Sequence, residues 1–438
     1  MPRATSRARR RWRCSPAGTP SPARSPTGLP PGEPALLARS AGRGQTARVT
    51  PLLRPLRRPQ ALVYALVAAA LLLTTVVVPQ AGAFEIPPLN PFGAESFEGE
   101  VLAVEETGRE QTPVGTILSQ RIVVRLQGGE AIVIERQFLE GDTIGLPVQA
   151  GDRVLVTANE NPGGTAYFIA DRSRAQPLWW LAVAFCALVA LVGRSRGAWS
   201  LLGLAASFLV IARFILPAIL TGWDPVVATV LGAGVIAFAT LVLAHGANWK
   251  TAAALGGTAL SLALAFALAR FGVGFVELTG LADEHSVALN ILSESAVDAR
   301  GLLLAGIIIG ALGVLDDVTA TQASAVFELR RANRALGVGE LFARGLNVGR
   351  DHIASTVNTL VLAYAGASLP LMALLASQAE PLGLLVSRDL LATEIVRTLV
   401  GSMGIVAAVP ITTGIAAVLA ASGRAEGEET APIDAGRR

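Results

Sequence analysis

The sequence predicts a membrane all-α protein: a polytopic bundle of about eight transmembrane helices, with a small all-β domain, a barrel or OB-like, after the first helix. Of its 438 residues, 52% are hydrophobic and only 16% are charged, whereas soluble domains carry about 25% charged residues. Several apolar runs exceed the roughly 18 residues that indicate a membrane-spanning helix. One segment near the N-terminus instead has the short, β-rich apolar clusters of a soluble module.

The N-terminal segment predicts an arm followed by one apolar helix. Residues 1–60 are basic, rich in Arg, Pro, Ser and Gly, and lack apolar periodicity, so we expect a disordered arm that fixes orientation rather than binding nucleic acid. In residues 61–83, an apolar run follows the arginines and ends near the small residues Ala81 and Ala83. This layout is typical of a signal-peptide-like segment or of an uncleaved signal anchor. Either alternative places the following residues outside the cytoplasm.

Residues 84–175 predict an extracytoplasmic β domain of about five strands. Gly128-Gly129, between two of its apolar clusters, indicates a hairpin turn. The segment has neither cysteine nor histidine, so it predicts no metal site, and its glutamates are expected to form a solvated face. In the scaffold alternative described below, this domain binds an extracytoplasmic protein partner. The apolar clusters are residues 101–104, 122–126, 131–134, 154–157 and 166–169.

Residues 176–421 predict the transmembrane bundle, and residues 422–438 a disordered cytoplasmic tail. The bundle opens with Trp179-Trp180, a pair typical of a membrane interface. With the N-terminal run, its apolar runs would cross the lipid bilayer about eight times. These runs are residues 177–192, 198–220, 225–244, 251–273, 301 onward, 352–377 and 391–421.

The loops between these runs alternate in charge, which predicts the topology. Arg and Lys in short loops mark the cytoplasmic side of a membrane, so both termini are expected in the cytoplasm if the first helix is retained. The basic loops contain Arg194, Arg196, Lys250, Arg330, Arg331, Arg334, Arg344 and Arg350. The acidic loops on the other side contain Asp224, Glu277, Asp283, Glu284, Glu294, Asp298, Glu380 and Asp389.

Two adjacent carboxylates, Asp316 and Asp317, lie in the apolar run that begins at residue 301. Ionisable groups at membrane depth are costly unless they face a partner or water, so they are candidates for function. At helical spacing, Asp317, Thr321 and Glu328 share one face. Adjacent carboxylates oppose each other's ionisation, which suits reversible protonation or the binding of a cation.

A second polar block lies in residues 347–368. Asp351 and Asn358 can share one helical face there, and His352 lies on a neighbouring face. Because consecutive antiparallel spans are expected to be neighbours, we expect this block to face the acidic pair. In a structural alternative, such hydroxyl and amide groups only bridge helices. In a third interpretation, the aspartates and His352 hold a divalent metal ion.

The remaining motifs favour packing over catalysis. Gly306, Gly310 and Gly313 are spaced for close approach of helices, or for a break in the helix. The sequence has no HExxH motif and no GxxxxGK[ST] phosphate loop. We therefore expect neither enzymatic activity nor a cofactor.

Two blocks, GALGVLDDVTATQASAVFEL at residues 310–329 and GRDHIASTVNTLVLAYAGASLP at residues 349–370, resemble the YibE/F-like family of bacterial membrane proteins. The resemblance extends from about Phe84 to about Ala421. It implies a multi-pass protein of the bacterial plasma membrane, and it implies no substrate, cofactor or catalytic residue.

Three functions are consistent with these patterns. The leading hypothesis is a proton- or cation-coupled permease for a small solute or ion that the sequence does not identify; a solvent-lined cavity that reaches Asp316 and Asp317 would favour it. A non-transporting scaffold, binding a partner through its outer β domain, would instead seal these acids with paired donors. An intramembrane metal-dependent enzyme would bring the acids together with His352. The sequence does not predict the oligomeric state.

Overall fold

The computed structural model of the chain describes seven stretches. Residues 1–57 of the predicted N-terminal arm, the small residues near the cleavage signal and most of the C-terminal tail lie outside the described residues, whereas the last three residues of the arm, 58–60, begin helix α1, Arg58–Leu72. The described stretches are residues 58–78, 95–113, 115–140, 147–161, 164–293, 296–377 and 380–422.

A five-stranded antiparallel sheet forms the β module, and its strand order is β3-β2-β1-β4-β5. Each predicted apolar cluster lies in one of the strands, so the prediction of five strands is confirmed. Gly129, in the turn between β2 and β3, has a φ of 85°, as the predicted hairpin turn requires. The edge strands β3 and β5 also contact each other, so the sheet is strongly curled. The strands are β1 Glu95–Thr112, β2 Gly115–Leu126, β3 Ala131–Leu139, β4 Arg153–Asn161 and β5 Gly164–Arg172.

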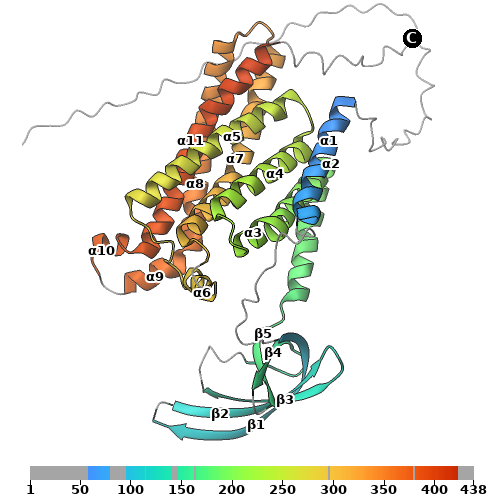
Figure 1. The fold of residues 1–438 in the computed structure, drawn as a ribbon, viewed down its shortest axis with the longest axis vertical. Helices are drawn as coiled ribbons and strands as arrows, with labels where there is room; N and C mark the ends of the chain where they lie inside the picture. Colours follow the sequence, from blue (N-terminus) through green and yellow to red (C-terminus); the bar gives the residue numbers. More distant parts are fainter. Residues whose placement is uncertain are drawn as a thin grey trace, which may run out of the picture. The chain divides into compact units, whose positions relative to one another are not determined.

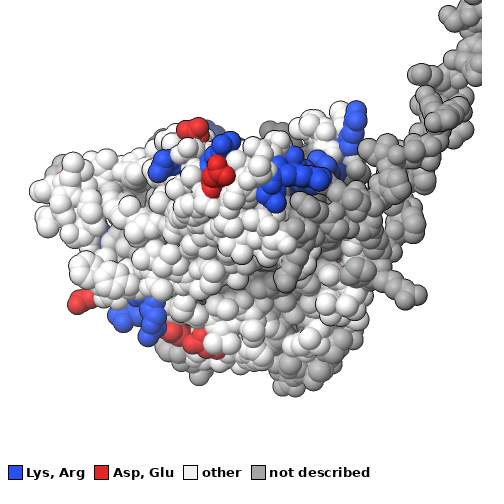
Figure 2. Space-filling model, turned by 90° about the horizontal axis from the view of Figure 1, so that it is seen from above, with Lys and Arg blue, Asp and Glu red and all other residues white. Residues whose placement is uncertain are grey.

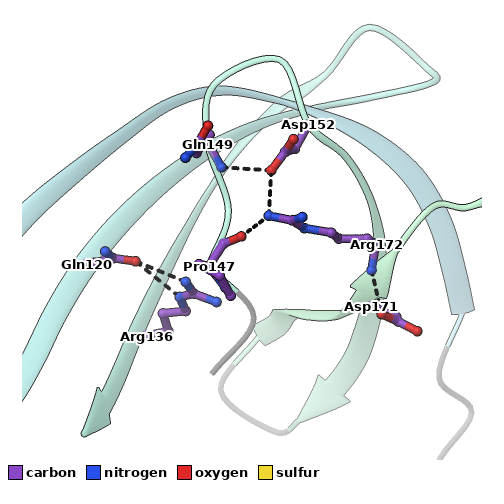
Figure 3. Close-up of polar contacts among 7 residues, drawn as sticks. All are labelled: Gln120, Arg136, Pro147, Gln149, Asp152, Asp171 and Arg172. Atoms are coloured by element: carbon purple, nitrogen blue, oxygen red, sulfur yellow. Dashed lines mark hydrogen bonds and ion pairs between the residues drawn. The ribbon is translucent and has the colours of Figure 1, made fainter. Parts of the chain in front are cut away.

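The inside of this sheet is apolar, and polar contacts fasten the segment before β4. Ile122, Val124 and Val154 are fully buried in its core. The guanidinium of Arg172 points toward the segment 147–152, where it donates to the carbonyl oxygen of Pro147 and lies 3.1 Å from Oδ2 of Asp152 (Figure 3). These contacts connect the end of β5 to the chain that leads into β4.

The rest of the described chain is helical (Figure 1). Aspartate and asparagine side chains cap the N-termini of α4, α5, α6 and α7 by accepting hydrogen bonds from backbone N–H groups. The elements are α1 Arg58–Leu72, the π-helix η1 Leu73–Val77, α2 Ala175–Val210, the π-helix η3 Ile211–Ile215, α3 Leu216–Leu220, α4 Pro225–His245, α5 Trp249–Phe275, α6 Glu284–Leu292, α7 Ala299–Ala332, α8 Val338–Ala367, α9 Leu369–Ser377, α10 Leu382–Val386 and α11 Asp389–Ala421.

Helix α2 is broken by a sharp reversal. The backbone of Arg194 has φ 51° and ψ −134°, which is outside the helical region. A Cβ added to Gly197 would collide with the carbonyl oxygen of Val189. Residues eight positions apart lie about 12 Å apart along a straight helix, so the chain after Arg194 runs back along the chain before it. The predicted runs 177–192 and 198–220 are thus the two arms of a helical hairpin.

Helices α5, α7 and α11 pack against one another at the centre of the bundle, with α4 and α8 against α7 (Figure 1). Small residues allow the close approach. A Cβ on Gly257 of α5 would collide with Thr412 of α11, and a Cβ on Gly404 of α11 would lie 3.2 Å from the Cβ of Ala265. Such contacts between small residues stabilise helix pairs in lipid, where the hydrophobic effect does not drive helices together.

Five helical segments are long and apolar enough to cross a membrane, and the bent pair α8–α9, with an angle of 60° between its helices, would make a sixth. The five are 175–220, α4, α5, α7 and α11. Figure 2 shows charged side chains gathered along two edges of the visible face, with uncharged surface between them. Large apolar side chains such as Trp179 and Phe271 are about two-thirds exposed, at 66% in each case. A bundle with this surface is a multi-pass membrane protein.

Candidate functional site

The candidate site lies along α7, the helix that contacts α4, α5, α8 and α11. Its side chains are unevenly distributed around the helix. Leu315, Val318 and Ala323 are buried in the bundle, whereas Asp317, Thr321 and Glu328 are exposed. The predicted polar stripe therefore exists, and it faces away from the packed core.

Asp316 is held by the neighbouring helix α4. Its Oδ2 lies 2.7 Å from the hydroxyl oxygen of Thr240, and that hydroxyl also lies 2.9 Å from the carbonyl oxygen of Ile236. A hydroxyl has one proton to donate. An ionised Asp316 can accept a hydrogen bond from the hydroxyl of Thr240. A protonated Asp316 can instead donate a hydrogen bond to that hydroxyl, while the hydroxyl donates to the carbonyl oxygen of Ile236. The local geometry accommodates both states of the carboxyl group.

The other carboxylate oxygen of Asp316, Oδ1, is buried and has no hydrogen-bonding partner among the described residues. An unpaired carboxylate away from water is unfavourable unless a proton or cation neutralises it. One turn further along α7, Thr319 shares a hydrogen bond of 2.7 Å with Thr258 of α5. Together, the contacts of Asp316 with Thr240 and of Thr319 with Thr258 form a polar seam that joins α7 to both α4 and α5.

Three cavities lie along the exposed side of α7. The outer cavity has a volume of about 390 Å³ and reaches Gly306 and Ile309. The middle cavity, of about 450 Å³, runs from Ile309 past Gly313 to Asp316. The inner cavity, of about 780 Å³, contains Asp317 and Glu328. Together they follow α7 over most of its length.

Neighbouring cavities share residues of their walls. Ile211 and Ile309 line both the outer and the middle cavity, and Ser200 and Ala244 line both the middle and the inner one. Ile211 begins the π-helix η3, and π-helical turns frequently occur at functional sites. The cavities therefore adjoin one another along α7, with Ile211 and Ile309 at one junction and Ser200 and Ala244 at the other.

The glycines of α7 leave this space open. A Cβ on Gly306 or on Gly313 would have no heavy atom within 4 Å, while a Cβ on Gly310 would lie 2.9 Å from the Tyr364 hydroxyl of α8. The prediction of close packing thus holds for Gly310 only. Gly306 and Gly313 line the outer and middle cavities instead.

The inner cavity is strongly charged. Arg196, Lys250 and Arg331 line it together with the acids Asp317 and Glu328, and Glu328 forms an ion pair of 2.5 Å with Arg331. These three basic residues come from three of the predicted basic loops. They surround one cavity, so these loops lie at the same end of the bundle, as the charge pattern predicted.

The outer cavity contains an ion pair and unpaired hydroxyls. Glu394 and Arg397 of α11 are 2.7 Å apart. The hydroxyls of Thr229 and Thr393 are buried there without a hydrogen-bonding partner in the described part of the chain. Asp283 lies on the same cavity wall and accepts hydrogen bonds from the backbone N–H and the hydroxyl of Ser286.

The residues predicted on α8 do not join the acidic pair. No residue of α8 is among the side chains that line the three cavities in the described structure. Asp351 and Asn358 are exposed, and His352 is half-buried with no hydrogen-bonding partner for Nε2 among the described residues. The expectation that this block faces Asp316 and Asp317 is therefore wrong, because α8 packs on another side of α7.

The metal-dependent alternative also lacks a site in the described residues. They contain no group of three or more His, Cys, Asp or Glu side chains that could hold a metal ion. On the side of α7 that meets α8 lies the buried polar side chain of Gln322. Its amide nitrogen donates to the carbonyl oxygen of Gly345 and to the hydroxyl of Thr413, each at 2.7 Å. No motif or charge in the sequence distinguishes Gln322 as a site residue.

The fold and this seam define a class: an integral, multi-pass membrane protein with acidic residues beside cavities in its helix bundle. The particular family follows from comparison. The family model described as YibE/F-like protein matches residues 181–422, more than half of the chain, and the chain belongs to this family. The match confirms the predicted resemblance for the helical part, while the β module lies outside it. No curated protein and no solved structure matches the chain significantly.

Proposed function

We propose that the protein is a proton- or cation-coupled permease whose path follows the exposed side of α7. The observation that carries this proposal is the series of three adjoining cavities that passes a carboxyl group with one unpartnered oxygen. A scaffold would be expected to seal both oxygens of Asp316 with donors. A coupling site instead needs a group that can bind and release a proton or a cation.

In this mechanism, Asp316 binds the proton or cation, and Thr240 turns its hydroxyl to suit the state of the carboxyl group. Asp317 and Glu328 exchange the ion with the cytoplasm through the inner cavity. Thr321 lies on the same exposed side of α7 between these two acids. Ile211 and Ile309 form the barrier between the outer and middle cavities.

The finer topology belongs to the same proposal. The α2 hairpin supplies two spans, the α8–α9 pair one, and the N-terminal helix with η1 one, which gives eight crossings with α4, α5, α7 and α11. The basic loops then face the cytoplasm of a bacterium, and the β module lies outside. Its curled five-stranded sheet, in which β3 meets β5, is consistent with a partly open barrel of the OB-like type.

Flux measurements in vesicles test the proposal. The full chain is reconstituted with a pH-sensitive dye inside, and a pH gradient or a gradient of Na⁺ or K⁺ is imposed, with a panel of small solutes added outside. We expect proton movement that depends on at least one cation or solute and that is lost in Asp316→Asn. Asp351→Asn is the matched control, because this carboxylate lines none of the cavities. Equal flux in wild type and Asp316→Asn would refute the proposal.

A further inference from the structure

Helix α8 presents its polar side away from the bundle. Its apolar side chains pack into the core beside Leu315 and Ile405. The opposite face carries exposed polar groups that recur every three or four residues. The packed side chains are Leu346, Ile353, Val357, Leu360 and Tyr364. The exposed ones, here named the α8 stripe, are the polar residues Asn347, Asp351, Ser355 and Asn358, followed by the apolar Leu362.

The centre of the α8 stripe lies at the depth of the middle of α11, a candidate span. A Cβ on Gly349 of α8 would collide with Val409 of α11. Further along, Leu360 of α8 lies 3.3 Å from the position of a Cβ on Gly401. Asn358 lies between these two contacts. Its carboxamide is therefore at the level of the hydrocarbon, far from either end of α11.

Three of these polar groups have no hydrogen-bonding partner in the described chain, whereas the amide oxygen of Asn347 accepts from the guanidinium of Arg350 at 3.1 Å. No hydrogen bond is formed by the side chain of Asp351, Ser355 or Asn358 with any described residue. A carboxamide or hydroxyl that faces lipid tails without a partner is unfavourable, and polar groups in spanning helices normally face another helix. The α8 stripe therefore requires a covering surface that is itself polar at the same depth.

We propose that a second copy of this chain covers the α8 stripe, so that two α8 helices pack in parallel about a two-fold axis normal to the membrane. Such an axis places every residue opposite its own equivalent at the same depth. A carboxamide contains both donors and an acceptor, and a hydroxyl can donate and accept. Asn358 and Ser355 can thus each pair with their own copies.

The charged end of the stripe fits the same arrangement. Asp351 follows Arg350, and both are exposed. Asp351 of one copy therefore meets Arg350 of the other at nearly the same height, and the two ion pairs are equivalent by symmetry. Spacings of three and four residues are those of helices that cross at a small left-handed angle. The small side chains of Ala354 and Ser355 permit the close approach.

Disulfide cross-linking of the full chain in membranes tests this inference. In a background with Cys14→Ser and Cys186→Ser, Ser355→Cys and Leu362→Cys are expected to give a dimer on mild oxidation. Leu260→Cys is the matched control, because Leu260 is 57% exposed on α5, and it should not cross-link.

A second experiment measures the dimer dissociation constant by single-molecule photobleaching in diluted vesicles, with one label on each chain. Asn358→Leu should raise this constant about tenfold, as the loss of an interhelical hydrogen bond predicts.

Several results would overturn the inference. One is equal cross-linking at Ser355→Cys and Leu260→Cys, and another is a monomer at every lipid dilution. A cross-link from the α8 stripe to a different protein would assign this face to that partner instead. Each chain contains its own three cavities, so loss of the dimer in Asn358→Leu together with unchanged flux supports both proposals. Loss of flux in Asp316→Asn leaves the cross-linking result unaffected.

Discussion

Thr240 holds one oxygen of Asp316 at 2.7 Å, while the other oxygen of that carboxyl group has no partner in the described structure. This pairing joins α4 to α7 at the end of the middle cavity. A carboxyl group arranged in this way can exchange a proton without a large movement of its neighbours, because only the hydroxyl of Thr240 has to rotate.

The first prediction concerns protonation of Asp316. Infrared difference spectra of vesicles, recorded as the pH changes, should contain a carbonyl band of a carboxylic acid that is absent in Asp316→Asn. Thr240→Val should shift this band, because it removes the hydroxyl that contacts the group. Asp351→Asn should leave the band unchanged. A band that persists in Asp316→Asn would show that another residue binds the proton.

The second prediction concerns access of water to the cavities. In a chain without native cysteines, Ser200→Cys should react with a membrane-impermeant thiol reagent added at the cytoplasmic side, since Ser200 lies where the inner and middle cavities meet. Leu362→Cys, on the exposed side of α8, should not react. Protection of Ser200→Cys from reagent on both sides would mean that the inner cavity is closed to water.

The third prediction separates flux from stability at Gly313. Leucine at this position fills the middle cavity, whose wall has no heavy atom within 4 Å of the added Cβ. Because leucine favours helix over glycine by about 0.5 to 1 kcal/mol, Gly313→Leu should remain folded and lose flux. Gly274→Leu, at an open position outside the cavities, is the control and should keep its flux. Undiminished flux in Gly313→Leu would place the path elsewhere.

The fourth prediction concerns Gln322, which joins α7 to α8 and α11. Gln322→Leu leaves the carbonyl of Gly345 and the hydroxyl of Thr413 without this donor, and it should reduce the free energy of unfolding by about 1 to 2 kcal/mol. Unfolding in mixed micelles measures the change. Thr321→Ala, at the adjacent exposed position, should change it by less than about 0.5 kcal/mol. Equal effects of the two substitutions would contradict the role given to Gln322.

The fifth prediction concerns pH at the outer cavity. Burial raises the pKa of Asp283, but hydrogen bonds from Ser286 outweigh it, and the pKa lies below its ordinary value of 3.8. A lowered folded-state pKa stabilises α6 above the unfolded pKa, and this contribution is lost as the pH falls through the folded value. Between pH 7 and pH 5, hydrogen exchange of α6, corrected for intrinsic rates, should stay constant. Loss of protection in that interval would indicate a different cap.

The strands and most helices could be predicted because their signals are local. Turn residues such as Gly129 separate the strands, and apolar length alone marks α4 and α5. The roles of Thr240 and Gln322 could not be predicted in this way. A single hydroxyl in an apolar run does not reveal which neighbouring helix it faces, because that depends on how the helices rotate when they pack.

The same limit explains the error about α8. Consecutive spans are expected to be neighbours, and α7 does contact α8. Each helix has several faces, however, and the tight fit of Gly349 against Val409 fixes the rotation of α8 so that Asp351 and Asn358 point away from α7. Close contacts of this kind, between helices distant in sequence, leave no periodic signal in either helix.

The reversal at Arg194 has a consequence for biogenesis. Because this turn is short, we expect both arms of the hairpin to enter the lipid together as one unit. In the proposed topology, Arg194 and Arg196 at its tip stay on the cytoplasmic side. The hairpin would then reinforce, for every later helix, the orientation that the basic N-terminal arm is expected to set.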